Sequence, residues 1–335
     1  MMKALVVHKP GDFCVEPQWE RPKAKPGWAV VKVAFCGVCG SDIPRFANTQ
    51  NYFHPCILGH EFSGVVEEVE ANAAVQKGDK VAVLPIIPCG KCPGCETRQP
   101  FNCQQYQFVG SRNNGGFAQY CLVPVGNLFK LPQAMALEEA SLIEPLLVAL
   151  HCVRRSGFQA GGQAVVYGAG PIGLLVAGWL RVFGAARVAV ADVRDFSVTI
   201  ARACGFEAYQ TLKEPLEGAF DYAFEAAGNG KALESAVGVL RHDGVLTVVG
   251  RDVRDTVIPV KVFETLMRKQ LTLNGCWGYN DAGEHSFLYQ VLEKGLFPLK
   301  ELISGVCSLD EAPAIIWKMI NREMEYCKVL VRCNE

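Results

Sequence analysis

Four closely spaced cysteines form the strongest chemical signal in the sequence. They lie in the stretch CGKCPGCETRQPFNC with the spacing C-x2-C-x2-C-x7-C, at Cys89, Cys92, Cys95 and Cys103. Four thiolates close a zinc tetrahedron and leave no position for a substrate, so such a site is structural rather than catalytic. The surrounding Pro- and Gly-rich loop has little apolar material, and a bound metal would hold it together. Iron–sulfur ligation also uses four cysteines, but nothing else in the sequence points to electron transfer.

A glycine-rich turn in AVVYGAGPIG gives a second chemical signal. Gly168, Gly170 and Gly173 follow an apolar strand pattern and lead directly into a helical pattern. These glycines allow a tight turn, close approach of the backbone to a pyrophosphate, and close packing of the helix on the strand. The helix begins near Pro171 and Ile172, where backbone amides and the helix dipole favour phosphate groups. The pattern predicts a dinucleotide-binding site.

An acid at the end of the next strand bears on the choice of dinucleotide. Asp192 ends the run RVAVAD, at the offset from the glycine turn expected for a carboxylate that binds ribose hydroxyls. Because this carboxylate would repel a 2′-phosphate, we expect NAD rather than NADP. Arg194 lies two residues further on and would weaken that preference.

Three separated fragments, GVCGSD, LGHEFSG and LIEPLLVALH, carry candidate ligands for a second metal ion. They contain Cys39, His60 with Glu61, and Glu144. One thiolate, one imidazole and one or two carboxylates suit a zinc ion that keeps an exchangeable position. Asp42 is suited to hold His60 through its other ring nitrogen. Taken singly, each residue also has an ordinary explanation as a core thiol, a buried histidine or a surface carboxylate.

The elements that must position these residues change in character along the chain. Up to about residue 135, short β-branched runs alternate with Gly, Pro and Asn or Asp, which predicts an antiparallel, partly barrel-like domain. The predicted strands cover residues 29–35, 63–69, 80–84 and 118–123.

From about residue 147, apolar strand runs alternate with helical patterns, which is typical of a doubly wound parallel sheet. Strands are predicted at residues 164–167, 187–191, 220–225 and 244–249, and helices at 172–183, 196–204 and 231–240. A further strand near 207–209 is followed by a short stretch with Pro215 and Gly218, so we expect this crossover to lack a full helix. Near the C-terminus, helices are predicted at 284–294 and 309–322 and a strand at 327–332.

Composition excludes several classes of protein. The 335 residues carry a net charge of −1, which gives no overall attraction to nucleic acid or to an anionic membrane. The N-terminal apolar run is too short for a signal peptide, and no stretch is long enough for a membrane helix, so we expect a cytoplasmic protein. Disulfides are then not expected among the 15 cysteines. We expect the scattered thiols Cys14, Cys56, Cys152 and Cys204 to be core residues.

Together, these fragments resemble the zinc-containing medium-chain dehydrogenase/reductase superfamily over nearly the whole chain. GVCGSD, GHEFSG, the four-cysteine lobe, GGFAQY, EPLLVALH and GAGPIG occur in the family's order. The resemblance implies an α/β protein with a GroES-like, mostly β catalytic domain at 1–146 and 279–335 and an inserted Rossmann domain at 147–278. It also implies an active site between the two domains. Cys39, rather than Cys36, matches the family's metal-binding cysteine, and His60 matches the second ligand.

The third ligand matches the polyol dehydrogenase branch, where a glutamate takes this place. Both Glu61 and Glu144 match that pattern, and the sequence leaves open which of them binds directly and which through water. The stretches CGSDIPR and FVGSRNNGGFAQY and the tryptophan of NGCWGY resemble the galactitol-1-phosphate dehydrogenases, ahead of the sorbitol dehydrogenases.

Two residues depart from the sorbitol dehydrogenase pattern. Pro44 stands where many relatives carry a proton-relay histidine, and Arg45 stands where sorbitol dehydrogenases place an aromatic residue. Arg45 is suited to pair with a substrate phosphate, or it is a surface salt-bridge partner. Tyr279 and Trp277 are candidates to line the substrate site, with simple packing as the alternative.

The resemblance implies a zinc-dependent, NAD-linked dehydrogenase that oxidises a secondary hydroxyl of a polyol or polyol phosphate to a ketose. One catalytic and one structural zinc are implied for each chain. Ser41 would accept the proton of the substrate hydroxyl while a hydride passes to NAD. The alternatives are a sorbitol-, L-iditol- or aldonate-type enzyme without a substrate phosphate, and an inactive dinucleotide-binding protein. The family usually forms homodimers or homotetramers.

Overall fold

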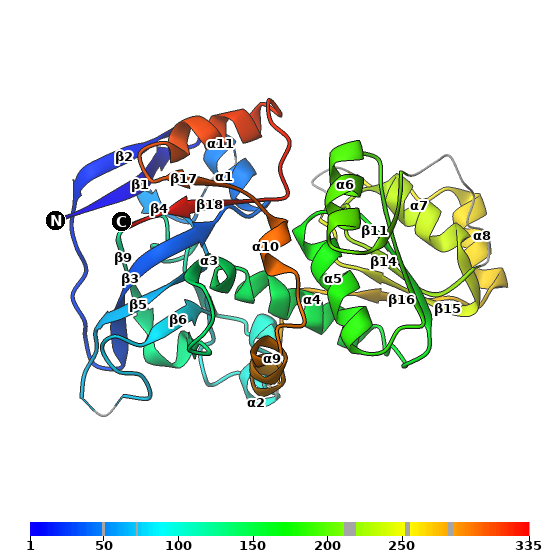
Figure 1. The fold of residues 1–335 in the computed structure, drawn as a ribbon, viewed down its shortest axis with the longest axis horizontal. Helices are drawn as coiled ribbons and strands as arrows, with labels where there is room; N and C mark the ends of the chain where they lie inside the picture. The colour runs from blue at the N-terminus through cyan, green and yellow to red at the C-terminus, as the bar shows by residue number, and fades with distance from the viewer. Residues whose placement is uncertain (49–50, 72, 211–218, 252–254, 281–283, 335) are drawn as a thin grey trace. The chain divides into compact units, whose positions relative to one another are not determined.

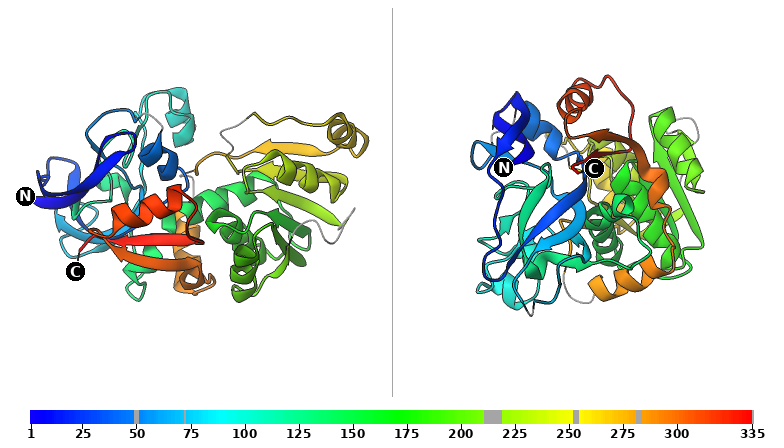
Figure 2. Two further views of the ribbon diagram at one scale, coloured as in Figure 1. Left: turned by 90° about the horizontal axis from the view of Figure 1, so that it is seen from above. Right: turned by 60° about the vertical axis from the view of Figure 1, so that its left-hand side comes forward.

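A computed structural model describes residues 1–48, 51–71, 73–210, 219–251, 255–280 and 284–334. Its internal contacts divide the chain into two compact units. The first unit comprises Met1–Glu144, Asn280–Lys294 and Ile303–Glu335, and the second comprises Pro145–Tyr279 and Gly295–Leu302. Figures 1 and 2 show that the N-terminal hairpin and the C-terminal strand belong to the same unit.

The first unit is built on two main sheets. A three-stranded sheet has the order β2-β1-β4, with β1 (Met2–Lys9), β2 (Asp12–Trp19) and β4 (Cys56–Ile57). The larger sheet has the order β10-β6-β5-β3-β18-β17, and β9 also pairs with β3. Its strands are β3 (Trp28–Gly37), β5 (Glu61–Glu68), β6 (Lys80–Val83), β9 (Tyr120–Pro124), β10 (Leu128–Lys130), β17 (Ile303–Ser308) and β18 (Lys328–Arg332). The predicted strands of this unit are confirmed, with ends shifted by a few residues, whereas the sequence analysis missed β10 and β17 of this sheet and the three strands of the smaller one.

Short elements complete the first unit. They are α1 (Asp42–Ala47), β7 (Ile86–Ile87), α2 (Pro93–Glu96), η1 (Pro100–Asn102), β8 (Gln107–Phe108), η2 (Val125–Asn127), α3 (Leu137–Ala140), α9 (Glu284–Glu293) and α11 (Ala312–Ile320). The predicted helices at 284–294 and 309–322 correspond to α9 and α11. Residues of β1, β3, β5, β6 and β9 form much of the apolar core of this unit, alternately along β3, β6 and β9 and consecutively from Ala4 to Val7 in β1.

The register of β3 brings distant segments together at one end of the larger sheet. Gly37, the last residue of β3, lies opposite Glu61 of β5 on one side and Leu330 of β18 on the other. A Cβ atom at Gly37 would lie 2.6 Å from a carboxylate oxygen of Glu61, so the glycine leaves the room that this carboxylate occupies. The loop that follows β3 carries Cys39.

The second unit is a six-stranded parallel sheet with helices. The strand order is β13-β12-β11-β14-β15-β16, and all its neighbouring pairs are parallel. The strands are β11 (Gln163–Tyr167), β12 (Arg187–Asp192), β13 (Glu207–Gln210), β14 (Phe220–Glu225), β15 (Leu240–Val248) and β16 (Thr272–Gly275). The strand order reverses between β11 and β14, and ligands of such sheets bind at the carboxyl ends beside this point. The doubly wound sheet is therefore confirmed.

Helices of the second unit follow the strands of its sheet. They are α5 (Pro171–Val182), α6 (Asp195–Ala203), α7 (Gly230–Gly238), α8 (Val260–Arg268) and α10 (Leu299–Leu302). The helix α4 (Ile143–Arg155) begins at the boundary between the units. The predicted helices correspond to α5, α6 and α7, whereas α4, α8 and α10 were missed. The predicted crossover at 211–218 lies outside the described residues.

The C-terminal return segment, predicted to belong wholly to the catalytic domain, is divided between the units. Residues 295–302 pack with the second unit. The Phe297 ring meets Trp179 of α5 edge-on, with 4.7 Å between the ring centroids. A Cβ atom at Gly178 would lie 2.5 Å from the Phe297 ring, so this glycine admits the phenylalanine. An apolar side chain in a short connecting segment thus decides which unit the segment joins.

The scattered cysteines divide into buried and exposed. Cys56, Cys152 and Cys204 are buried as predicted, whereas Cys14 is exposed, so its prediction as a core residue was wrong. Cys14 follows the buried Phe13 on β2, and successive residues of a strand face opposite sides. Its thiol instead lies within 3.8 Å of both His8 and Glu16. Within the described residues, no helix is long and apolar enough to cross a membrane.

Candidate active site

Three of the four predicted ligands of the catalytic metal meet in the first unit. Ligand atoms of Cys39, His60 and Glu61 all lie within 4.8 Å of one another. Cys39 comes from the loop after β3, His60 precedes β5, and Glu61 is the first residue of β5. The strand pairing that places Gly37 opposite Glu61 therefore also brings these three side chains together.

Asp42 connects two of these side chains. Its Oδ1 lies 3.4 Å from Nδ1 of His60, an ion-pair contact, and its Oδ2 accepts a hydrogen bond of 3.1 Å from the Cys39 amide. Burial disfavours a charged His60, yet the nearby Asp42 carboxylate and Cys39 thiolate raise the pKa of His60 well above its ordinary value. Because Asp42 occupies the Nδ1 side of the ring, Nε2 is the nitrogen that remains for a metal ion.

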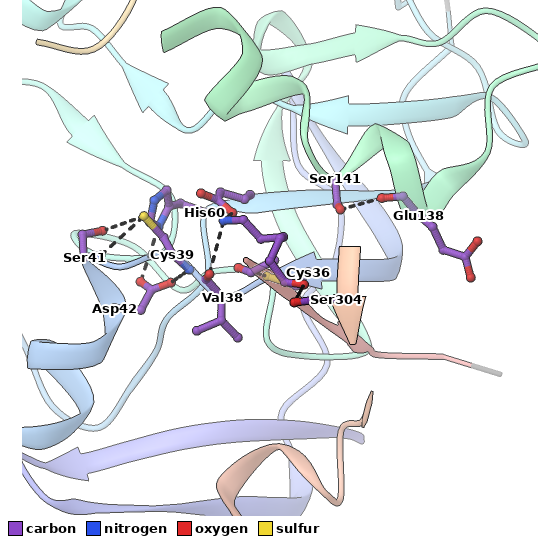
Figure 3. A network of polar contacts seen from close by, with 12 residues as sticks. Cys36, Val38, Cys39, Ser41, Asp42, His60, Glu138, Ser141 and Ser304 are labelled. Atoms are coloured by element: carbon purple, nitrogen blue, oxygen red, sulfur yellow. Dashed lines mark hydrogen bonds and ion pairs between the residues drawn. The ribbon is translucent and has the colours of Figure 1, made fainter. Parts of the chain in front are cut away.

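Ser41 lies directly beside the candidate ligand Cys39. Its hydroxyl donates a hydrogen bond to the Cys39 sulfur at 3.3 Å, and its backbone amide approaches the same sulfur at 3.5 Å. Figure 3 shows Cys39, Ser41, Asp42 and His60 grouped together, with dashed lines from Ser41 to the Cys39 sulfur and from His60 to Asp42. The hydroxyl keeps lone pairs that can accept a proton from another group.

A buried lysine that the sequence analysis missed holds the Glu61 carboxylate. Lys328, the first residue of β18, places Nζ 2.5 Å from Oε2 of Glu61 and 3.2 Å from the carbonyl oxygen of Val38. Both charged residues are only 2 % exposed. Burial lowers the pKa of Lys328, but Glu61 and Cys39 outweigh it and the pKa is raised. A lysine next to the apolar run VLV was the available signal, since a buried charge requires a partner.

Glu144, the fourth predicted ligand, lies in the same electrostatic environment but outside the group of three. It stands in the first turn of α4 and is 7 % exposed. Burial is the main cause that raises its pKa to about 7, with Glu61 adding to the effect and His60 opposing it. The geometry thus brings Glu61, rather than Glu144, close to Cys39 and His60.

The donor set of this cluster fits a cation. The acidic groups outnumber the basic ones, since Cys39, Asp42, Glu61 and Glu144 face His60 and Lys328. Buried carboxylates are costly without a compensating positive charge, and a divalent ion would supply it. A sulfur, an imidazole nitrogen and a carboxylate oxygen are the donors that zinc accepts at catalytic sites.

The four predicted structural ligands also meet. Cys89, Cys92, Cys95 and Cys103 form one group with ligand atoms within 4.8 Å of one another. The sulfur of Cys95 lies 3.9 Å from that of Cys89 and 3.6 Å from that of Cys92. A tetrahedron with zinc–sulfur bonds of about 2.3 Å has edges of about 3.8 Å, so these sulfurs already stand at the required separation.

Backbone amides prepare the lobe for thiolates. The amide of Cys89 donates to the Cys103 sulfur and that of Gly90 donates to the Cys95 sulfur, both at 3.3 Å. Amides of Gln104 and Cys95 are the main causes that lower the pKa of Cys92 to about 6. The pKa of Cys103 is lowered too. For Cys89, the amide of Lys91 lowers the pKa, but burial and hydrogen bonds from the other thiols outweigh it and raise the pKa to about 11. Because zinc binds thiolates, Cys92 and Cys103 are the positions where the surroundings favour the ligating form.

The glycine turn has the shape expected for a pyrophosphate site. Gly168 adopts a φ of 105°, and a Cβ there would lie 2.6 Å from the Ala227 nitrogen, so only glycine fits. A Cβ at Gly173 would lie 1.8 Å from the Gly168 oxygen, which explains the close packing of α5. A Cβ at Gly170 would meet no atom within 4 Å, so open space remains beside this backbone. Pro171 and Ile172 are the first residues of α5, so the N-terminus of this helix, with its backbone amides, lies at this space.

Asp192 ends β12 beside this turn. Its Oδ2 accepts a hydrogen bond from the Ala169 amide at 2.8 Å, and its Oδ1 accepts one from the Arg194 amide at 2.9 Å. The Arg194 side chain also lies 3.6 Å from the carboxylate. The carboxylate is thereby anchored next to the space at the glycine turn, where it can accept ribose hydroxyls.

The two predicted substrate residues have different surroundings. Arg45, in the last turn of α1, donates a long hydrogen bond of 3.5 Å to Asn51 and lies over the Tyr52 ring. The side chain of Tyr279 is only 2 % exposed. This burial agrees with packing, the alternative for a lone aromatic residue, whereas Trp277 is exposed.

Comparisons with known proteins agree with this arrangement. Residues 25–133 match the family model described as "Alcohol dehydrogenase GroES-like domain", and residues 171–294 match "Zinc-binding dehydrogenase". Galactitol 1-phosphate 5-dehydrogenase of Escherichia coli K12 is 33 % identical over 258 residues, 74 % of this chain and 75 % of its own length. Sorbitol dehydrogenase of Bacillus subtilis is 29 % identical over 99 % of this chain and 98 % of its own length. The crystal structure of E. coli galactitol-1-phosphate dehydrogenase has a TM-score of 0.92 and 29 % identity, and covers 99 % of this chain and 100 % of that one.

Proposed function

The chain belongs to the polyol dehydrogenases of the zinc-containing medium-chain dehydrogenase/reductase superfamily, and from this premise we propose that it oxidises a sugar-alcohol phosphate, as a galactitol-1-phosphate 5-dehydrogenase does. The product would be the corresponding phosphorylated ketose. The observation that carries the proposal is the convergence of Cys39, from the loop after β3, with the adjacent residues His60 and Glu61 at the start of β5. An inactive dinucleotide-binding protein would have no use for this set.

We assign the catalytic zinc to Cys39, His60 and Glu61, with Glu144 as a nearby carboxylate, and the structural zinc to Cys89, Cys92, Cys95 and Cys103. When bound, the catalytic ion supplies a Lewis acid that lowers the pKa of a substrate hydroxyl, and NAD accepts the hydride. Asp42 holds the His60 ring so that Nε2 is presented to the ion. Lys328 holds one oxygen of Glu61 and leaves the other for coordination.

We assign the first proton transfer to Ser41. Its hydroxyl lies 3.3 Å from the sulfur of Cys39, one of the residues that would hold the ion, and it can accept the proton of the substrate hydroxyl while it passes its own proton on. Pro44 provides no titratable group in place of the relay histidine of many relatives. We therefore expect the proton to pass from Ser41 to water.

We propose NAD as the preferred dinucleotide. Gly168, Gly170 and Gly173 leave space for the pyrophosphate, and Asp192 is anchored where it accepts ribose hydroxyls. The Asp192 carboxylate would repel a 2′-phosphate, while the side chain of Arg194 is already engaged by that carboxylate.

A substrate and cofactor panel tests the proposal. The zinc-loaded enzyme should show its highest kcat/KM with galactitol 1-phosphate and NAD, above galactitol, sorbitol, L-iditol and an aldonate. NADP should give a kcat/KM at least about tenfold lower, because each 1.4 kcal/mol of lost binding costs a factor of ten. A preference for sorbitol or L-iditol would instead establish the sorbitol-type alternative, and a preference for NADP would contradict the role of Asp192.

We also propose that the enzyme forms a homodimer or homotetramer. The edge strand β16 and the helix α8 expose several large apolar side chains of the second unit, including Phe263, Met267 and Leu273. An exposed apolar sheet edge favours pairing with another chain.

A further inference from the structure

We propose that Arg45 and Arg112 together bind the phosphate group of the substrate. This inference rests on the proposed function, and it adds Arg112, which the sequence analysis did not single out. The two arginines come from different segments of the first unit, α1 and the loop after β8, and both lie against the ring of Tyr52.

Contacts with aromatic rings define the position of Arg112. Its guanidinium carbon lies 4.1 Å from the centroid of the Tyr106 ring and 4.6 Å from that of Tyr52. Nη1 donates to the Tyr106 carbonyl oxygen at 3.0 Å, and Nη2 donates to the Tyr52 hydroxyl at 3.3 Å. Stacking on two rings fixes the plane of the guanidinium and leaves further N–H groups for another acceptor.

Arg45 approaches the same Tyr52 ring from α1. Its guanidinium carbon lies 5.6 Å from the ring centroid. Asn51 accepts a hydrogen bond from Nη1 and donates one to the Arg45 carbonyl oxygen, so this amide, which is 5 % exposed, orients the arginine. Tyr52 is 60 % exposed and both arginines are half-buried, so the two cations can still be reached by a solute.

Within the described part of the chain, neither guanidinium is neutralised by an acid. Among the residues that the structure describes, no carboxylate oxygen lies within 4.0 Å of Arg45 or Arg112, whereas Arg21, Arg187 and Arg241 each have such a partner. Two uncompensated cations beside one ring create a positive potential that attracts an anion. A phosphate monoester carries a charge of about −2 and offers three oxygens to guanidinium forks, whereas an aldonate offers a single charge.

Both arginines are connected to the candidate metal ligands through neighbouring residues. Ser41 and Arg45 lie one helical turn apart, and residues with this spacing share a face. On the other side, the Phe108 ring lies 5.6 Å from the His60 ring and 6.5 Å from the Tyr106 ring on which Arg112 stacks. In a polyol phosphate, several bonds separate the phosphate from the hydroxyl that reacts. An anion site that lies near Cys39 and His60, but not in contact with them, suits such a substrate.

Variants of the two arginines test this site in the zinc-loaded, full-length enzyme. Arg45→Ala and Arg112→Ala should each lower kcat/KM for galactitol 1-phosphate about 10- to 100-fold, as expected for loss of a charge-assisted contact. The value for unphosphorylated galactitol should change less than about threefold, since no such contact is lost. Titration calorimetry with inorganic phosphate, at saturating NADH, should show weaker binding in both variants. Arg112→Lys, which keeps the charge but loses the fork, should fall between Arg112→Ala and the wild type.

Arg21→Ala is the matched control. Arg21 also stacks on a tyrosine, 4.3 Å from the Tyr120 centroid, but it is paired with Glu68 at 2.7 Å. The Arg21→Ala change should leave the phosphate affinity unchanged, and also the ratio of kcat/KM for galactitol 1-phosphate to kcat/KM for galactitol. Equal losses toward both substrates, or phosphate binding that survives in both arginine variants, would overturn the anion site. If Arg112→Ala fails to fold, Arg112→Lys and Arg45→Ala still decide between these outcomes.

The outcome for the anion site can be separated from that for the proposed function. A wild-type enzyme that oxidises galactitol as well as its phosphate would contradict the proposed substrate. In that case, phosphate affinity that still depends on Arg45 and Arg112 would support the anion site alone.

Discussion

The two candidate zinc sites of the first unit are built in opposite ways. The lobe takes all its ligands from one short segment, Cys89 to Cys103, and its sulfurs receive hydrogen bonds from backbone amides. The catalytic cluster collects Cys39 from one segment and His60 with Glu61 from another, and the side-chain charges of Asp42 and Lys328 hold it. A site made from local spacing can be recognised in the sequence, whereas a site made from strand register depends on the whole sheet.

The two sites also differ in how their charges are stabilised. Backbone amides stabilise thiolates without adding a net charge, so the lobe needs only its metal. The catalytic cluster places Glu61, Glu144 and Lys328 in the interior, where each charge depends on the others. We therefore expect substitutions in the catalytic cluster to affect more than one property, and substitutions in the lobe to act through its metal.

The largest effect on turnover is expected from Cys39→Ser. Loss of the thiolate ligand removes a Lewis acid that contributes several kcal/mol, so kcat should fall at least about a thousandfold. Zinc content should fall by about one equivalent per chain because the lobe keeps its own ion. NAD affinity, measured by fluorescence titration, should stay near the wild-type value. Full activity in this variant would remove Cys39 from the set of ligands.

A smaller loss of turnover, combined with lost stability, is expected from Lys328→Met. This change leaves the buried Glu61 carboxylate without its partner and should lower the free energy of unfolding by about 3–5 kcal/mol in the metal-free protein. Added zinc should recover part of that loss, because the ion supplies the missing positive charge. Urea unfolding with and without zinc measures both values.

Two further variants of this pair serve as controls. Lys328→Arg should retain most of the stability, and adding Glu61→Gln to Lys328→Met should restore part of it, because no buried charge is then unpaired. A single Lys328→Met variant as stable as the wild type would show that the ion pair contributes nothing net.

The smallest effect on turnover is expected from Cys95→Ser in the lobe. This variant should lose the structural zinc and melt at a lower temperature, while the remaining active enzyme keeps the kcat of the wild type at low temperature. Cys14→Ser is the matched control, because Cys14 lies in an exposed His8–Cys14–Glu16 group of the same unit. It should change neither zinc content nor melting temperature. A Cys95→Ser variant that is inactive from the start would show that the two sites are coupled.

Regular, strongly patterned segments were predictable from the sequence. The strands and helices that alternate after residue 147 appear as β11, α5, β12 and α6, because long apolar runs and the glycine turn leave few alternatives. Short segments were not. The strand β17 and the helix α10 have weak patterns, and the exposure of Cys14 depends on how the β1–β2 hairpin lies on its sheet.

Local spacing alone determined the four-cysteine lobe and the glycine turn, since their ligating atoms and amides belong to neighbouring residues whose geometry the backbone limits. Only the tertiary structure decided that Glu61, and not Glu144, joins Cys39 and His60, and that Lys328 holds it. The physical reason is strand register: Gly37 of β3 pairs with both Glu61 and Leu330, so residues far apart in the chain become neighbours once the sheet has formed. No pattern within a single segment contains that pairing.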